Sequence, residues 1–246
     1  MTMEHLFTAK VETCVDFVFV IDATCGKTRL IKTIEEGTLS FYENLCNALA
    51  QRQKSLQKLR VKVNWFRDFY FDGKYAYGES KFFELPEENE DFRKYVASIR
   101  AAGGGDDPES ALEALSLAMR SDFTQDGDRR KHIIVLFTDQ PAHAFEDYDR
   151  LVKEASEYGC DPVIYPADMP KSLMQLYDEW DGHGLNRHAK IDNRGKGLIL
   201  FAPDGYPWDD MEIDLERLLR VPVSRGGDCE EFCWADFWEL FKYPIL

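Results

Sequence analysis

Short apolar runs separated by segments with helical spacing constrain the fold of this chain more than any other feature. Residues 15–21 (VDFVFVI), 132–138 (HIIVLFT) and 197–201 (GLILF) are rich in Val, Ile, Leu and Phe. Such runs are typical of strands covered on both faces. Because helical segments lie between them, the sequence predicts an α/β protein with a mostly parallel central sheet and helices on both faces.

The remaining segments extend this alternation. Two more strands are predicted at residues 59–66 and 162–165, and one short antiparallel edge strand at 82–85. Apolar spacing predicts helices at 29–59, 86–100, 109–119, 145–158, 171–181, 209–220 and 230–241. We therefore expect a three-layer α/β/α, doubly wound, Rossmann-like fold. A single domain is expected over residues 1–246, with its core at 12–203 and a C-terminal helical extension at 204–246 packing on the core.

Charge excludes some partners. The 45 acidic and 30 basic residues give a net charge of −15, which repels nucleic acid and acidic membrane surfaces. The N-terminus lacks a secretion signal, and no apolar segment approaches the roughly 18 residues of a membrane span. The six cysteines lie far apart except for Cys229 and Cys233, and in a cytoplasmic chain they should be reduced. We expect a cytoplasmic protein that binds neither nucleic acid nor membrane.

The loop after the first apolar run ends in Gly26-Lys27-Thr28, which matches the tail of a phosphate-binding P-loop. A P-loop also needs a glycine five positions before Gly26, so that backbone N–H groups can curl around the phosphates. Ile21 occupies that position, inside the predicted strand. The sequence therefore disfavours nucleotide binding here, and Lys27 and Thr28 are expected to begin a helix and face solvent.

Three acidic loops favour a metal site instead. Asp22 and Asp139 directly follow apolar runs, and Asp106 lies in a glycine-rich loop that opens a helix. Ligands of an open parallel sheet collect outside the carboxyl ends of its strands. Oxygen ligands from three loops, with the Thr24 hydroxyl among them, suit a partly hydrated hard cation, Mg²⁺ in particular, or Mn²⁺ or Ca²⁺. The competing interpretation is that each aspartate only caps a helix.

The same three loops carry a family resemblance. The segments Asp22-Ala-Thr24-Cys-Gly26, 103–109 (GGGDDPE) and 133–139 (IIVLFTD) resemble the three loops of a von Willebrand factor A (vWA) domain, over roughly residues 12–203. Arg67-Asp68, at the end of the second predicted strand, resembles the intracellular branch of this family found in bacteria and beside atypical kinases. The resemblance implies a vWA fold with a metal-ion-dependent adhesion site (MIDAS).

Carried over by position, Asp22, Thr24, Asp106 and Asp139 match the family's metal ligands, and Glu109 resembles an additional acid of some variants. The departure is Gly26, where the family has a serine. A water held at Gly26 or the hydroxyl of Thr28 would have to replace that oxygen.

The resemblance implies a function without bond making: a partner protein presents an Asp or Glu that completes the coordination of Mg²⁺. Kinase, phosphatase or ATPase systems, parts of which resemble such A domains, would supply the partner. Two alternatives stay open. One is a metal-independent interaction module with a decayed site. The other is a metal-dependent hydrolase or phosphotransfer enzyme using His143 as base or Asp22 as nucleophile.

Overall fold

The computed structural model describes residues 12–51, 54–104, 107–160, 168–183 and 191–240. The predicted strand at 162–165 and the predicted ligand Asp106 lie outside these residues. The strands are β1 (Glu12–Asp22), β2 (Ser55–Phe66), β3 (Tyr77–Glu79), β4 (Phe83–Leu85), β5 (Arg129–Phe137), β6 (Lys196–Ala202) and β7 (Leu218–Pro222). The α-helices are α1 (Thr28–Ala50), α2 (Asn89–Ser98), α3 (Ala111–Met119), α4 (Tyr148–Glu157), α5 (Leu173–Trp180), α6 (Trp208–Asp214) and α7 (Trp234–Leu240).

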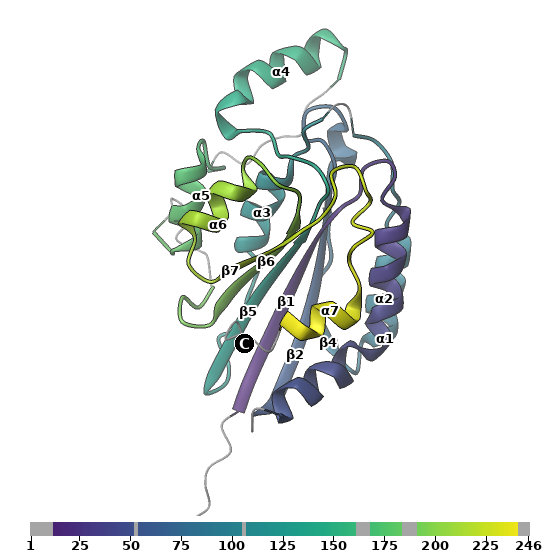
Figure 1. Ribbon diagram of the computed structural model, residues 1–246, viewed down its shortest axis with the longest axis vertical. Helices are drawn as coiled ribbons and strands as arrows, with labels where there is room; N and C mark the ends of the chain where they lie inside the picture. The colour runs from purple at the N-terminus through teal and green to yellow at the C-terminus, as the bar shows by residue number, and fades with distance from the viewer. Residues whose placement is uncertain (1–11, 52–53, 105–106, 161–167, 184–190, 241–246) are drawn as a thin grey trace, which may run out of the picture.

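One sheet organises the protein (Figure 1). Its strands run in the order β3-β2-β1-β5-β6-β7, and β2, β1, β5, β6 and β7 are parallel to their neighbours. The two short strands β3 and β4 pair antiparallel with different stretches of β2. The fold is thus the expected α/β, mostly parallel, vWA-type architecture, with two short antiparallel strands at the edge where one was predicted.

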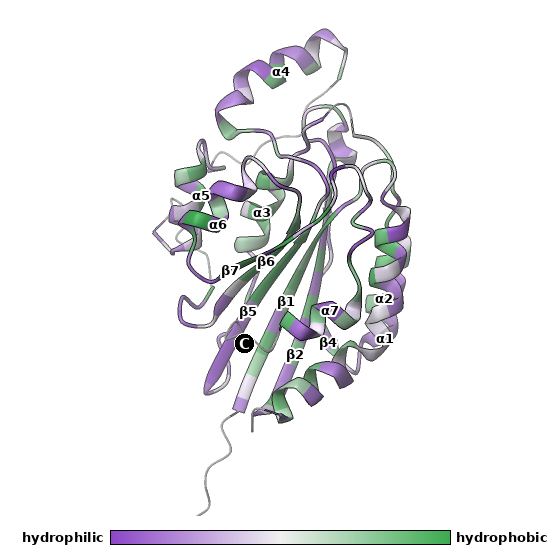
Figure 2. Ribbon diagram, viewed as in Figure 1, coloured by the Kyte–Doolittle hydropathy of each residue, from purple (hydrophilic) through white to green (hydrophobic). Residues whose placement is uncertain are grey.

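Alternate residues of β1 build two separate cores. Phe17 and Phe19 pack into a cluster with α1, α2 and α7, whereas Val18 and Val20 pack into a second cluster with α3, α5 and α6. Figure 1 shows these helices on opposite faces of the sheet, and Figure 2 shows the hydrophobic colouring concentrated along the strands between them. No helix among the described residues is both long and apolar enough to cross a bilayer.

Two predicted elements were wrong in extent. The helix predicted at 29–59 ends at Ala50, and β2 begins at Ser55, because Leu56 and Leu59 belong to the strand's buried pattern rather than to the helix. The predicted helix at 209–220 ends at Asp214, and residues 218–222 form β7. The segment 204–246 is therefore not purely helical, since it completes the sheet as a strand beside β6.

The C-terminal helix α7 is fastened to α1 by a tryptophan. The indole Nε1 of Trp234 donates a hydrogen bond of 2.8 Å to the carbonyl of Thr33. A Cβ at Gly37 would lie only 1.8 Å from that nitrogen, so the indole fits because Gly37 has no side chain. Phe237 is fully buried on the same core. The result is an aromatic cluster that holds the C-terminal segment close to the start of the chain's first helix.

Candidate functional site at the carboxyl edge of the sheet

Asp22 ends β1 at the carboxyl edge of the sheet and is completely buried. Its Oδ1 accepts hydrogen bonds from the backbone N–H of Thr24 at 3.0 Å and from the Thr24 hydroxyl at 2.7 Å. Its Oδ2 accepts one from the hydroxyl of Thr138 at 3.1 Å. The structure therefore brings together Asp22 and Thr24 as predicted, and adds Thr138 from the end of β5.

Asp139 follows β5 and is also completely buried. Its Oδ1 lies 2.7 Å from Nζ of Lys27, and its Oδ2 accepts a hydrogen bond of 2.5 Å from the backbone N–H of Asp228. Its carbonyl accepts a further bond from Gly226 N–H at 3.0 Å. Asp139 thus joins the β1–α1 loop to the segment that follows β7.

The expectation that Lys27 faces solvent was wrong. The residue stands at the N-cap of α1, as predicted, but it is only 4% exposed and its ammonium points at Asp139. Burial alone lowers the pKa of this ammonium, but the nearby charges of Asp22 and Asp139 outweigh it and raise the pKa above its ordinary value. Lys27 is therefore held in its charged form.

Gly26 and Thr28, the candidate replacements for the missing serine, are both exposed. Gly26 has a φ of 99°, in the left-handed region that side chains rarely adopt. A serine here would have open space for its Cβ but a strained backbone. Thr28 is the first residue of α1. The loop conformation itself explains why glycine stands at this position, and the turn that it makes is followed at once by the buried Lys27.

Glu109 lies in the segment that opens α3, and the charge of Asp22 acts on its carboxyl. It pairs through its backbone with the segment after Asp139, since its N–H donates to the carbonyl of Pro141 at 3.1 Å. Its carboxyl is buried, and Oε2 has no hydrogen-bond partner among the described residues. Burial, together with the negative charges of Asp22, Asp68 and Asp72, raises the pKa of Glu109 to about 10. Glu109 is therefore a neutral acid at pH 7.

Arg67 and Asp68 form hydrogen bonds with the loops around this edge. The Arg67 guanidinium donates to the carbonyls of Ala23 at 3.2 Å, Tyr75 at 3.1 Å and Arg100 at 2.7 Å. Asp68 accepts a backbone N–H from Tyr70 at 2.6 Å. These contacts position the loops after β1 and β2 relative to each other.

The catalytic candidate His143 is buried, and its Nε2 lies 3.4 Å from Oδ2 of Asp68. Its ring packs edge-on against Tyr70, with the ring centroids 5.4 Å apart. These contacts place the imidazole within the Arg67-Asp68 region of the edge.

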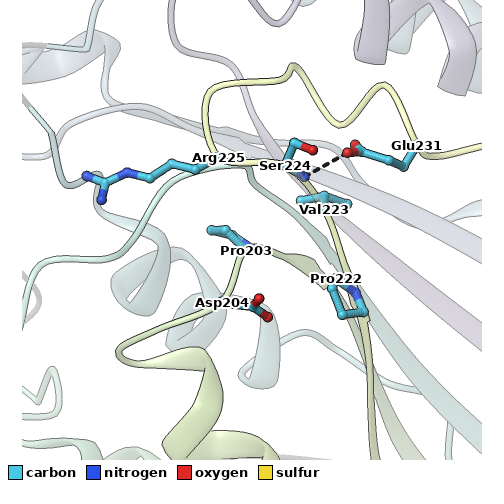
Figure 3. A pocket seen from close by; sticks show the side chains of 7 residues that line it. All are labelled: Pro203, Asp204, Pro222, Val223, Ser224, Arg225 and Glu231. Atoms are coloured by element: carbon cyan, nitrogen blue, oxygen red, sulfur yellow. Dashed lines mark hydrogen bonds between the residues drawn. The ribbon is translucent and has the colours of Figure 1, made fainter.

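A hollow opens beside this edge, where β6 and β7 end (Figure 3). Its volume is about 420 Å³, and it is lined by Pro203, Asp204, Pro222, Val223, Ser224, Arg225 and Glu231. The backbone N–H of Ser224 donates to Oε1 of Glu231 at 2.8 Å, and the Arg225 guanidinium pairs with Asp107 at 2.5 Å. The hollow and the buried charges are linked, because Gly226 and Asp228 in the same segment bond to Asp139.

The side chains fit a divalent cation poorly in this arrangement. The oxygens of Asp22 and Asp139 each face a hydrogen-bond donor or the Lys27 ammonium, and Gly26 offers no side-chain oxygen. Mg²⁺ requires an open set of oxygens in near-octahedral geometry. Within the described ranges, no three His, Cys, Asp or Glu side chains are grouped to hold a metal. Mg²⁺ binding therefore stays a prediction.

Lys27, Asp228 and Thr138 are residues that the sequence did not place in the site. The signal for Lys27 was visible as the Gly-Lys-Thr tail, but the mismatch to a P-loop led to the wrong location for its side chain. Asp228 has no comparable signal: its backbone N–H donates to Asp139, and its carboxyl accepts the backbone N–H groups of Arg29 and Leu30 at the start of α1.

Comparisons with known proteins agree with this geometry. The family described as the von Willebrand factor A domain matches residues 81–164. Together with the sheet order and the loop residues at its carboxyl edge, this match, over about a third of the chain, supports a vWA domain protein. A vWA domain suggests a protein-interaction or adhesion module.

Two similar proteins show how far the likeness extends. The Dictyostelium discoideum protein named alpha-protein kinase vwkA is 25% identical over 133 residues, which cover 54% of this chain and 19% of that protein. The chain thus spans only a small part of this relative. The crystal structure of the pilus adhesin SpaC from Lactobacillus rhamnosus GG, in its open conformation, aligns with a TM-score of 0.50 at 13% identity. The alignment covers 95% of this chain and 31% of the adhesin chain. At this identity the likeness is one of fold.

Proposed function

We propose that this vWA domain binds a partner protein at the carboxyl edge of its sheet. The observation that carries the proposal is the junction at Asp139, where the loop after β1 and the segment after β7 meet over buried charges. Ligands of open parallel sheets bind outside the carboxyl ends of the strands. The exposed residues around this junction, Cys25, Thr28 and Arg225, would form the docking rim beside the hollow of Figure 3.

The partner is proposed to be a protein that presents an Asp or Glu, from a kinase, phosphatase or ATPase system. Similarity to part of a protein named as a kinase supports the first of these. We place the protein in the cytoplasm, which its free cysteines support, because disulfides are rare there. Coordination of Mg²⁺ by the partner's carboxylate is the metal-dependent form of this proposal.

The contacts at the edge favour binding over catalysis. Both Asp22 oxygens accept hydrogen bonds from threonine groups, which occupies the candidate nucleophile. His143 is buried against Asp68 and Tyr70, so it would need a rearrangement to act as a base on a docked substrate.

Site-specific photo-crosslinking in the source cells tests the docking edge. A photoreactive residue at Thr28 or at Arg225 should give the same discrete protein adduct. The matched control is Gln51, which is exposed at the far end of α1. Equal adducts from Gln51, or none from the two edge positions, would contradict the proposal.

A further inference from the structure

Lys27 is a buried cation inside a cluster of acids. Its Nζ lies 2.7 Å from Asp139 Oδ1, and the negative charge of Asp22 also acts on it. Isolated charges are very costly to bury, whereas a cation paired with one carboxylate and attracted by a second offsets part of their desolvation. The ammonium therefore supplies the positive charge that the two buried aspartates at this edge require.

A divalent ion would have to compete with this ammonium for the same oxygens. The second oxygen of Asp139 is bonded to the Asp228 N–H, and both oxygens of Asp22 are bonded to threonine groups. An ion placed among them would also be repelled by Lys27 at close range. Among the described residues, the cation that meets these oxygens is thus Lys27, which is covalently part of the chain.

The local sequence explains how Lys27 reaches this place. Gly26 adopts a φ of 99°, which turns the chain just before α1. The residue after the turn points inward, and its four-carbon stem is long enough to bring Nζ to Asp139 across the loop. Gly26, which makes this turn, stands where the family has a serine. The same loop therefore lacks one ligand oxygen and brings the Lys27 ammonium to Asp139.

We propose that the Lys27 ammonium takes the place of the divalent ion at this edge, so that the site is complete without metal. The consequence for docking rests on the proposed function: a partner would bind here equally well in a chelator. The partner would then contact the loops that Lys27 holds in position, because Lys27 itself is buried.

The first test uses the native chain. Binding of Mn²⁺ is followed by the loss of the electron paramagnetic resonance signal of the free ion, and the melting temperature is measured in EDTA and in millimolar Mg²⁺. We expect no site-specific Mn²⁺ binding and no shift in melting temperature. Binding that Asp139→Ala abolishes would overturn the proposal.

The second test removes the ammonium but keeps an apolar stem, as Lys27→Met. Two buried aspartates then lack their cation, so the variant should melt lower in EDTA and recover when Mg²⁺ or Mn²⁺ is added. Lys27→Arg, which keeps the charge, should stay insensitive to metal. Lys32→Met, at an exposed position of α1, is the matched control. An unaltered melting temperature for Lys27→Met would contradict the proposal, and if that variant does not fold, the native-chain measurement decides.

The crosslinking experiment separates this inference from the proposed function. Adducts from Thr28 that form equally in permeabilised cells with EDTA or Mg²⁺ support both. Adducts that form only with Mg²⁺ would support the docking edge but contradict the proposal that Lys27 replaces the metal ion. Absence of adducts, with a native chain that is insensitive to metal, overturns the docking edge and leaves the role of Lys27 intact.

Discussion

Two buried aspartates of β1, Asp16 near the middle of the strand and Asp22 at its carboxyl end, are stabilised in different ways. Asp16 accepts two hydrogen bonds from the Arg60 guanidinium, at 2.9 and 2.6 Å, and one from the Thr124 N–H at 2.6 Å. Asp22 accepts bonds from threonine groups, and the cation near it, Lys27, pairs with Asp139.

The two kinds of partner separate a purely structural contact at Asp16 from the candidate site at Asp22. A planar guanidinium that binds a carboxylate through two parallel bonds fixes both groups in one geometry. An ammonium is a point charge on a flexible stem, and here it is placed between the acids of two loops. The Arg60–Asp16 pair therefore fixes both groups in one geometry, whereas at Asp22 and Asp139 a flexible ammonium stands where a divalent ion was expected.

Arg60→Met should have the largest effect. It leaves Asp16 buried with only the Thr124 N–H, and breaking a buried ion pair in this way costs about 3 kcal/mol. It also removes the guanidinium from the face of the Phe82 ring, 4.4 Å away. Urea unfolding measures the loss, with the exposed Lys153→Met as control. Unlike Lys27→Met, this variant should not recover in Mg²⁺. Recovery in Mg²⁺ would contradict the proposed difference between the surroundings of Asp16 and those of Asp22.

Glu109 should make the protein less stable as the pH rises. Its pKa is about 10 when folded, against 4.5 for an ordinary glutamate, so the folded state keeps a proton that the unfolded chain releases. Between these values stability falls by up to about 1.4 kcal/mol per pH unit.

Glu109→Gln, which is neutral at every pH, should flatten this dependence and raise stability at pH 8. Urea unfolding at a series of pH values measures the effect. Exposed Glu146→Gln should follow the native profile. An unchanged slope for Glu109→Gln would mean that the carboxyl is ionised in the folded protein.

His132, near Asp16, should give the opposite pH dependence of stability. Burial lowers the pKa of its imidazole, whose Nδ1 accepts the Asp192 N–H at 2.8 Å. The unfolded chain therefore binds a proton below about pH 6.5 that the folded state resists, and stability falls as the pH drops. We expect stability to fall between about pH 6.5 and 5.5. His132→Gln should lessen this slope in the same titration. A slope equal to that of the native chain would assign the loss to other groups.

Arg225→Ala should have the smallest effect on stability. Its ion pair with Asp107 lies at the surface, with the arginine side chain 61% exposed, and such pairs contribute about 0–1 kcal/mol. Thermal melting at low and high salt measures it. A loss well above 1 kcal/mol would mean that the segment after β7 depends on this one contact and not on the bonds to Asp139.

Much of the fold was predictable because burial imposes a pattern on the sequence. Runs such as residues 15–21 and 197–201 can hide their apolar side chains only in a covered sheet, and the structure places both there. The errors arose where one pattern served two elements. Leu56 fits helical spacing after Leu49, yet it belongs to β2, and Leu218 fits the preceding helix, yet it belongs to β7.

The site was predictable in part. Strand ends followed by acids located Asp22, Thr24 and Asp139 at one edge, since parallel strands end together. The prediction of a metal bound there remains untested. The side-chain direction of Lys27 could not be read from the sequence, because it depends on the φ of Gly26 and on an acid more than a hundred residues away.

The sequence by itself determined the α/β class and the gathering of acids at one edge, because these follow from local burial patterns and from the geometry of parallel strands. The resemblance to vWA domains came from the residues of three loops. Only the tertiary structure decided which charge meets those acids. Lys27, Asp139 and the Asp228 N–H come from three distant segments, and their pairing exists only once the sheet has brought the strand ends together.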